Sequence, residues 1–168
     1  MLPTPLPDAE AQCAELARLI RPRLAPNTAL VGIHSGGAWI ARRLRELLEL
    51  PEEIGLIDVS FYRDDFGAKG LHPQVRPTTI PFAVEGRPLI LVDDVLYTGR
   101  TTRAAINELF DYGRPARIDL AVLADRGGRE LPVCAQFCAW QVVLGDDEEL
   151  ILEPDAAGRL QWRLARHA

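Results

Sequence analysis

One stretch of the sequence, residues 89–102, restricts the possible folds more than any other. It opens with four consecutive apolar residues, Leu89 to Val92. Such a run is typical of a strand covered on both faces, as the strands of parallel sheets are. Two aspartates, Asp93 and Asp94, follow at once, and a Thr-Gly-Arg-Thr-Thr turn at residues 98–102 opens the next helix. The stretch therefore predicts a buried parallel strand that ends in a polar corner.

The rest of the chain alternates between strand and helix patterns. This alternation implies right-handed crossovers, so we expect an α/β fold with a mainly parallel sheet flanked by helices. Ligand sites in such sheets lie beyond the carboxyl ends of the strands, which places the functional loops just after Ile33, Phe61, Val92 and Ala124. The expected helices are Asp8–Leu24, Ala38–Leu50 and Thr101–Tyr112, and the expected strands are Ala29–Ile33, Ile54–Phe61, Leu89–Val92 and Ile118–Ala124.

Two regions depart from this alternation. Residues 62–88 contain four prolines and are longer than a usual connection, so we expect a lid or an irregular hairpin over a site, with a plain surface loop as the alternative. The C-terminal third, about residues 133–164, suggests added strands at Val133–Leu144, Leu150–Glu153 and Leu160–Leu164, the last two forming a hairpin. No linker divides the chain, so residues 1–168 are expected to form one domain.

Composition limits the location and the partners. The 168 residues are 48% hydrophobic and 26% charged, with no apolar stretch long enough for a bilayer and no secretory signal, so we expect a cytoplasmic protein without membrane contact. Cys13, Cys134 and Cys138 lack the spacing of a zinc site or a disulfide framework. A net charge of −5 disfavours broad binding to nucleic acid, and we expect no DNA partner, although a local arginine patch stays possible.

The turn at residues 98–102 has the residues of a phosphate pocket. Helix N-terminal N–H groups and threonine hydroxyls bind a phosphate dianion, and Gly99 allows close approach of the backbone. Asp93 and Asp94 would repel a bare phosphate, so they require hydroxyl donors or Mg²⁺, which a phosphorylated ribose with its metal ion supplies. The alternative is a pair of capping or turn aspartates. Neither GxxxxGK[ST] nor a helix-opening GxGxxG is present.

The motif resembles the phosphoribosyl-pyrophosphate (PRPP) signature of type I phosphoribosyltransferases, and Val-Asp-Asp-Val-Leu-Tyr-Thr-Gly-Arg-Thr from Val92 is similar to the PyrR family in particular. Two further stretches match that family: Tyr62-Arg63-Asp64-Asp65, and Leu123 to Pro132 after the next strand. With Val31-Gly32-Ile33, the resemblance covers most of residues 29–135. It implies the type I phosphoribosyltransferase fold and a pyrimidine-operon regulator that is also a uracil phosphoribosyltransferase, forming UMP and pyrophosphate from uracil and PRPP.

The resemblance also implies roles for single residues. Asp93 and Asp94 would bind the ribose hydroxyls and, with Arg63 from the lid, form the catalytic group. Mg²⁺ would arrive with PRPP, and no direct protein ligand is assigned to it. The whole PRPP segment is Asp93, Asp94, Val95, Leu96, Tyr97, Thr98, Gly99, Arg100, Thr101 and Thr102. The pyrophosphate loop is His34, Ser35, Gly36 and Gly37, and the base region is Asp125, Arg126, Gly127 and Arg129.

The chain departs from the family pattern at two places. The first loop reads His-Ser-Gly-Gly where PyrR proteins usually have Thr-Arg-Gly, and residues 133–140 lack the usual Gly-Lys-Asn. These departures keep two alternatives open. One is an RNA-binding attenuation regulator that senses UMP or UTP with weak or no turnover, and the other is a phosphoribosyltransferase for a purine base. A homodimer or higher homo-oligomer is expected in each case.

Overall fold

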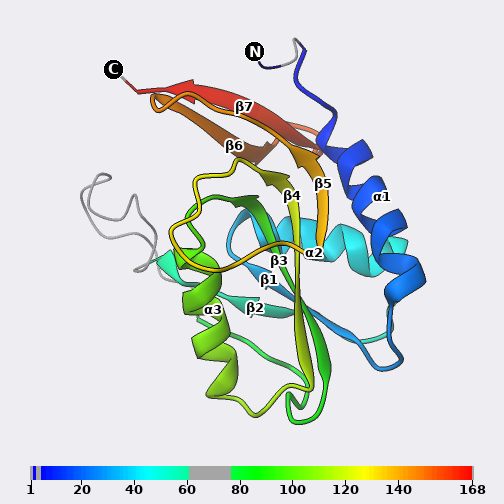
Figure 1. Cartoon of the computed structure of the whole chain (residues 1–168). Coiled ribbons are helices and arrows are strands. Elements are labelled where there is room, and N and C mark those ends of the chain that lie inside the picture. Colours follow the sequence, from blue (N-terminus) through cyan, green and yellow to red (C-terminus); the bar gives the residue numbers. More distant parts are fainter. Residues whose placement is uncertain (1, 3–4, 61–76, 168) are drawn as a thin grey trace.

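The centre of the protein is a five-stranded parallel sheet, seen in a computed structural model that describes residues 2, 5–60 and 77–167 (Figure 1). Its strand order is β2-β1-β3-β4-β5, and every neighbouring pair is parallel. The predicted parallel sheet is therefore confirmed. The strands are β1 (Ala29–Ile33), β2 (Gly55–Ile57), β3 (Pro88–Leu96), β4 (Arg117–Asp125) and β5 (Phe137–Gln141).

In the described part of the chain, three α-helices cover the two faces of the sheet. Helices α1 (Ala9–Ile20) and α2 (Gly36–Leu47) lie on one face, and α3 (Arg100–Phe110) lies on the other (Figure 1). Along β3, Ile90 and Val92 pack toward α1 and α2, whereas Leu89 and Leu91 pack toward α3. Burial on both faces explains why this strand has no polar residue between Leu89 and Val92.

Several element boundaries differ from the predicted ones. Helix α1 ends at Ile20, not Leu24, and a 3₁₀ turn (Arg21–Arg23) follows, because Pro22 has no N–H to continue the α-helical bonding. Asp8, the first residue of the expected helix, is its N-cap, and its Oδ1 accepts hydrogen bonds from the N–H groups of Glu10 (2.9 Å) and Ala11 (3.4 Å). Helix α2 begins two residues before the predicted Ala38, so its first turn includes two glycines.

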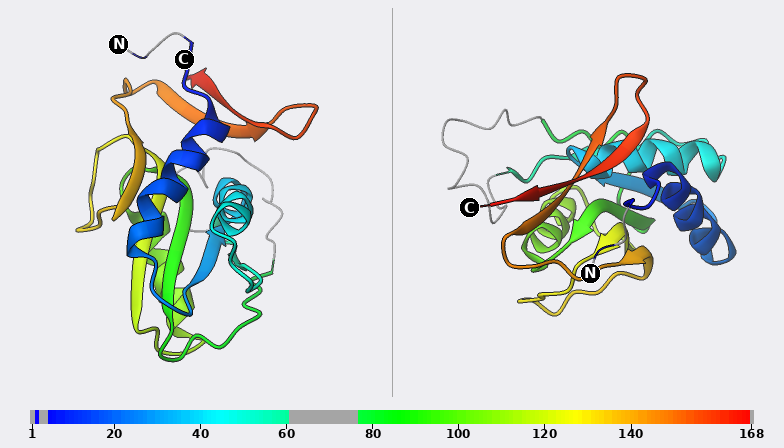
Figure 2. Two further views of the ribbon diagram at one scale, coloured as in Figure 1. Left: turned by 90° about the vertical axis from the view of Figure 1, so that its right-hand side faces the viewer. Right: turned by 90° about the horizontal axis from the view of Figure 1, so that it is seen from above.

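The predicted C-terminal hairpin is present as β6 (Glu148–Pro154) and β7 (Leu160–Arg166), an antiparallel pair separate from the main sheet. It lies at the same end of the molecule as the segment that precedes α1 (Figure 2). The Trp162 side chain packs into the core beside α1, where its Nε1 donates a 2.6 Å hydrogen bond to Gln12 Oε1. The stretch Val133–Leu144 differs from expectation, since its strand, β5, extends the parallel sheet.

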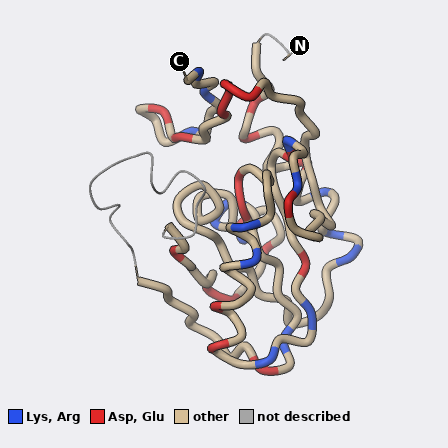
Figure 3. Tube along the Cα trace, turned by 60° about the vertical axis from the view of Figure 1, so that its left-hand side comes forward, with Lys and Arg blue, Asp and Glu red and all other residues tan. Residues whose placement is uncertain are grey.

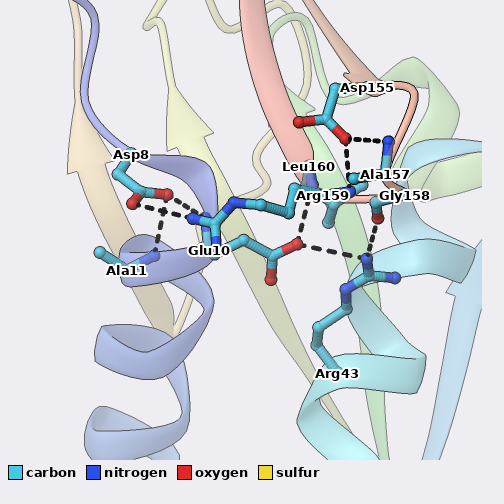
Figure 4. Close-up of polar contacts among 9 residues, drawn as sticks. All are labelled: Asp8, Glu10, Ala11, Arg43, Asp155, Ala157, Gly158, Arg159 and Leu160. Atoms are coloured by element: carbon cyan, nitrogen blue, oxygen red, sulfur yellow. Dashed lines mark hydrogen bonds and ion pairs between the residues drawn. The ribbon is translucent and has the colours of Figure 1, made fainter.

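A polar network anchors the hairpin to both helices of that face (Figure 4). Glu10 Oε1 accepts hydrogen bonds from the Leu160 N–H (2.8 Å) and from Arg43 Nη2 (3.2 Å). The same Arg43 nitrogen donates to the Gly158 carbonyl at 2.8 Å, and Arg159 pairs with Asp8 at 3.3 Å. The two ends of the chain are therefore bonded together through α1 and α2.

The predicted lid, residues 62–88, falls mostly on residues 61–76, which lie outside the described part of the chain. Beyond it, Thr79 exchanges two backbone hydrogen bonds of 2.8 Å with Leu56 of β2, and Ile80 and Phe82 pack on the core beneath α3. Closure of a lid stays a prediction. Within the described residues, none of the helices has the length and apolar character needed to cross a membrane.

Candidate functional site

The predicted loops meet at one edge of the sheet because β1, β3 and β4 are parallel neighbours. In the strand register Gly32 lies beside Val92, and Leu96 lies beside Asp125. The loops after β1, β3 and β4 therefore leave the sheet side by side, and the amino ends of α2 and α3 come to the same edge (Figure 1). The fourth predicted contributor, Arg63, lies outside the described residues.

The two aspartates lie on β3 itself, which continues to Leu96, four residues beyond the predicted strand end. Asp93 is buried, with 4% of its surface exposed, and Asp94 is half-buried. Asp93 Oδ1 accepts the Asp94 N–H at 2.9 Å, and Asp94 Oδ1 accepts the Val95 N–H at 2.8 Å. Each carboxylate is thus oriented by a local backbone hydrogen bond, as a pair of turn aspartates would be. A carboxylate can accept several hydrogen bonds, so this bond leaves Asp94 with acceptor capacity for a ligand.

The first loop packs directly on these aspartates. A Cβ added to Gly36 would overlap the Asp94 carboxylate, and one added to Gly37 would overlap the carbonyl oxygen of Val92. The amino end of α2 lies so close to β3 that a side chain at either position would clash with the strand, which accounts for the two glycines. The His34 N–H donates to the Ile57 carbonyl at 2.8 Å, which ties the start of the loop to β2. The His34–Ser35 peptide bond is cis.

The predicted phosphate turn opens α3. Gly99 has a φ of 95° and precedes the first residue of the helix, a conformation that glycine adopts at little cost. Thr98 and Thr102 are buried, at 6% and 2% exposure, and Thr101 is half-buried. The Thr98 hydroxyl accepts the Arg100 N–H at 3.3 Å. The amino end of α3, whose first N–H groups have no acceptor within the helix itself, therefore lies at the sheet edge beside Asp93 and Asp94.

The predicted base region forms a loop that packs on this turn. Arg129 Nη2 donates to both carboxylate oxygens of Asp125, at 2.8 and 2.7 Å, and the Gly127 N–H donates to Asp125 Oδ1 at 2.9 Å. Ion pairs are possible between Arg126 or Arg129 and the neighbouring carboxylates of Asp125 and Glu130. Of these the structure forms Arg129–Asp125, while Glu130 pairs with Arg100 at 2.7 Å.

Sequence reasoning missed the contacts of Tyr97 within this site. The Arg126 guanidinium carbon lies 4.0 Å from the centre of the Tyr97 ring, and Arg129 Nη1 donates to the Tyr97 carbonyl at 2.5 Å. Arg126 Nη1 also donates to the Glu148 carbonyl at 3.2 Å, which brings the start of β6 to the same edge. The one available signal in the sequence was the pair of arginines within residues 126–129. Their partner Tyr97 lies about thirty positions away, and no local sequence pattern connects it to them.

The side chains at this edge could supply only part of the ligand shell of a hard cation such as Mg²⁺. In the described ranges, no group of three or more His, Cys, Asp or Glu side chains is arranged to hold a metal ion. The carboxylate oxygens of Asp93 and Asp94 are the ligand type that Mg²⁺ prefers, and Mg²⁺ is commonly bound through one or two carboxylates plus substrate phosphates. The residues therefore fit an ion that brings most of its ligands with it.

Comparison with known proteins agrees with this geometry. The model of the phosphoribosyl transferase domain matches residues 5–148. A protein of Ralstonia nicotianae named Bifunctional protein PyrR is 52% identical over 155 residues, covering 90% of this chain and 88% of the relative. The protein of that name from Pseudomonas aeruginosa (strain LESB58) is 50% identical over 168 residues, covering 100% and 95%. The chain belongs to the PyrR family of phosphoribosyltransferases.

Solved structures of other phosphoribosyltransferases share the fold of this PyrR family member. A hypoxanthine-guanine phosphoribosyltransferase from Bacillus anthracis aligns with a TM-score of 0.64 at 18% identity, covering 80% of this chain and 79% of the other. Hypoxanthine phosphoribosyltransferase from Trypanosoma cruzi aligns with a TM-score of 0.62 at 24% identity, covering 80% and 77%. The type I phosphoribosyltransferase fold expected from the sequence is confirmed, with the β6–β7 hairpin as the added C-terminal strands.

Proposed function

We propose that the protein is a uracil phosphoribosyltransferase of the PyrR type, which converts uracil and PRPP to UMP and pyrophosphate. One observation carries the proposal. Two adjacent carboxylates on β3, a phosphate-type turn at the amino end of α3 and the glycine-rich first loop all lie at one sheet edge. This is the arrangement that a ribose carrying phosphate on one side and pyrophosphate on the other requires.

In the proposed complex, the 5-phosphate of PRPP binds the N–H groups at the start of α3 and the hydroxyls of Thr98 to Thr102. Asp93 and Asp94 bind the ribose hydroxyls. Their negative charge stabilises the positive charge that develops on the ring as the C1–O bond to pyrophosphate breaks. N1 of uracil attacks C1 from the opposite face, loses its proton, and forms UMP. The protein contributes position and electrostatics, and no covalent intermediate is needed.

Pyrophosphate is proposed to lie against the first loop. The amino end of α2 offers N–H groups from Gly36 and Gly37, and this compensates in part for the arginine that the loop lacks. Mg²⁺, which enters with PRPP, supplies charge neutralisation for the leaving pyrophosphate. Closure of the lid, with Arg63 reaching the pyrophosphate and excluding water, is part of the proposal.

The base is proposed to bind near Asp125, Arg126, Gly127 and Arg129, because this loop follows the strand next to β3 and begins opposite the end of the PRPP segment. The loop is made rigid by its own ion pair, so base selection would fall to backbone groups and to the remaining acceptor capacity of Asp125. Uracil is chosen over a purine on the strength of the family, since the residues themselves do not distinguish the bases.

The deciding experiment measures UMP formation from uracil and PRPP, with and without Mg²⁺, with hypoxanthine and guanine as competing bases. Mg²⁺-dependent UMP synthesis that neither purine suppresses is the expected result. Preferential formation of a purine nucleotide would replace the substrate and keep the reaction class. No turnover with any base, together with tight UMP binding, would replace the enzyme by a nucleotide sensor.

Regulation by RNA binding is the second candidate function, and it is favoured by relatives that are named as bifunctional. Acidic and basic positions are interspersed over the described chain (Figure 3), so an RNA surface would depend on a local group of arginines brought together in a homodimer or larger homo-oligomer. The test is RNA affinity with and without UMP or UTP at several salt concentrations. Steep salt dependence together with a nucleotide effect would support it.

A further inference from the structure

Tyr97 is the last residue before the phosphate turn and is held from several directions. Its side chain is 44% exposed, so burial alone does not fix it. The Arg126 guanidinium covers one face of the ring, 4.0 Å from its centre. At the ring edge Gly128 approaches so closely that an added Cβ would overlap it. The segment after β4 thus contacts Tyr97, the residue just before the phosphate turn, on the face and at the edge of its ring.

Arg129 makes the most bonds within this segment. Its Nη1 donates to the Tyr97 carbonyl at 2.5 Å, its Nε to the Val133 carbonyl at 3.0 Å, and its Nη2 to both oxygens of Asp125. The arginine side chain is 23% exposed and that of Asp125 is 17% exposed. One guanidinium therefore joins the end of β4, the phosphate turn and the segment that leads into β5, and it has little capacity left for a ligand.

Backbone bonds connect the same two loops at three more points. The Arg126 N–H donates to the Leu96 carbonyl at 3.0 Å, and the N–H groups of Glu130 and Leu131 donate to the Thr98 carbonyl at 2.9 and 3.1 Å. Every carbonyl from Leu96 to Thr98 therefore has a partner in residues 126–131. Of these three carbonyls, the central one, that of Tyr97, accepts from a side chain, that of Arg129, whereas the other two accept from backbone N–H groups.

We propose that Arg129 is a positioning residue for the 5-phosphate subsite, acting through the Tyr97 carbonyl to hold the Thr98–Gly99 turn against the start of α3. This inference rests on the proposed function, in which that turn binds the 5-phosphate. It reassigns Arg129 from base contact to support of the phosphate turn. Lysine cannot replace it, because a single ammonium does not offer the planar fork that reaches Tyr97, Val133 and Asp125 together.

Loss of this support should weaken the contribution that the 5-phosphate makes to the binding of UMP. N–H groups at a helix start bind phosphate through closely defined geometry. In active sites a misplacement of about 1 Å can lower the reaction rate by up to about a hundredfold, which shows how sensitive such positioning is. Loss of the Arg129 bond leaves the Tyr97 carbonyl and the turn less restrained. UMP, which carries the 5-phosphate, would bind more weakly, whereas uridine, which lacks it, would be affected much less.

The experiment measures the affinities of UMP and uridine by calorimetry for the wild type, Arg129→Ala and Arg129→Lys. For both variants the ratio of UMP affinity to uridine affinity is expected to fall about tenfold, equivalent to about 1.4 kcal/mol. The KM for PRPP should rise by a larger factor than the KM for uracil. A merely structural loss would lower both affinities together and leave the ratio unchanged, and that result would overturn the proposal.

Two further variants keep the test decisive. Arg117→Gln removes an Arg–Asp pair with Asp119 at the opposite end of β4 and should leave the ratio unchanged. Gly128→Ala pushes on the Tyr97 ring without removing a charge, and it should lower the ratio even if the Arg129 variants fold poorly. An unchanged ratio in a folded Gly128→Ala protein would contradict the inference. Failure of the wild type to bind UMP or use PRPP would instead refute the proposed function.

Discussion

At the residue scale, Asp93 and Asp94 perform different tasks although they are adjacent. Asp93 is almost fully buried and supports the backbone of its neighbour, whereas Asp94 is half-buried and lies against the first loop. The proposed ribose-binding role therefore predicts that a substitution at Asp94 lowers activity strongly and fold stability little. The change to asparagine keeps the shape of the side chain and its acceptor oxygen but removes the negative charge.

For Asp94→Asn we expect kcat/KM for PRPP to fall about a hundredfold, because an electrostatic group that faces a developing charge is removed. The melting temperature should stay close to that of the wild type. Asp93→Asn should also lower activity. Steady-state kinetics with varied PRPP, together with thermal unfolding, measure both effects. Full activity in both variants would remove the ribose assignment.

The two first-loop glycines give a matched pair of substitutions. In Gly36→Ala the new methyl group meets the Asp94 side chain, whose carboxylate must turn away, so activity should fall while stability falls less than in the matched variant. In Gly37→Ala it meets the Val92 carbonyl, which cannot move without bending β3, so stability should fall by about 1–3 kcal/mol. Urea unfolding and kinetics separate the two. Equal effects would mean that the loop is not packed on Asp94 as described.

Cys13 carries a pH-dependent contribution to stability. Burial, with the nearby Glu10 charge second, raises the pKa of its thiol from an ordinary 9.0 to about 12. Over that interval the unfolded thiol has lost its proton and the folded one has kept it, so the free energy of unfolding falls as pH rises. At pH 8 the exposed Cys134 should react with iodoacetamide and Cys13 should not. A Cys13→Ala variant should lack this alkaline slope, and an identical slope would contradict the assignment.

At the element scale, the sequence predicted the parts whose signal is local. The run from Leu89 to Val92 indicated a doubly covered strand because its own residues carry that information, and the loops at the sheet edge followed from the strand direction. The place of β5 beside β4 depends on pairing between residues far apart, for which Phe137–Gln141 has no distinct pattern. The contacts between Tyr97 and the loop after β4 were missed for the same reason, since they join segments about thirty residues apart.

The helix boundaries that differ from the predicted ones are set by local backbone chemistry, which competes with the pattern of apolar residues. Pro22 ended α1 before the last apolar position, although the helical spacing continued to Leu24. The glycines at positions 36 and 37, read from the sequence as a turn, form the first turn of α2 because close packing on β3 favours them there. In both cases the pattern of apolar residues was correct, and backbone chemistry decided where the element began or ended.

At the scale of the whole molecule, the hairpin links the two ends of the chain to the candidate site. Glu10 on α1 holds the backbone of β7 and the Arg43 side chain of α2 (Figure 4), while Arg126 in the loop after β4 bonds to the first residue of β6. Among the described strands, neither β6 nor β7 pairs with a strand of the main sheet. Its attachment therefore depends on the buried side chains of Leu150, Leu152, Leu160 and Trp162 and on these polar bonds, and it is expected to be the first element to separate.

Glu10→Ala tests this dependence. The substitution removes the acceptor of the Leu160 N–H and the partner of Arg43, and both groups are then only partly solvated, so the free energy of unfolding should fall by about 1–3 kcal/mol. Amide hydrogen exchange should speed up in β6 and β7, with little change in β3 and β4, because local opening precedes global unfolding. Glu15→Ala is the control on the same helix, since it removes an exposed ion pair with Arg18, and both residues of that pair belong to α1. Uniform acceleration across all strands in Glu10→Ala would show that the hairpin and the sheet unfold as one cooperative unit.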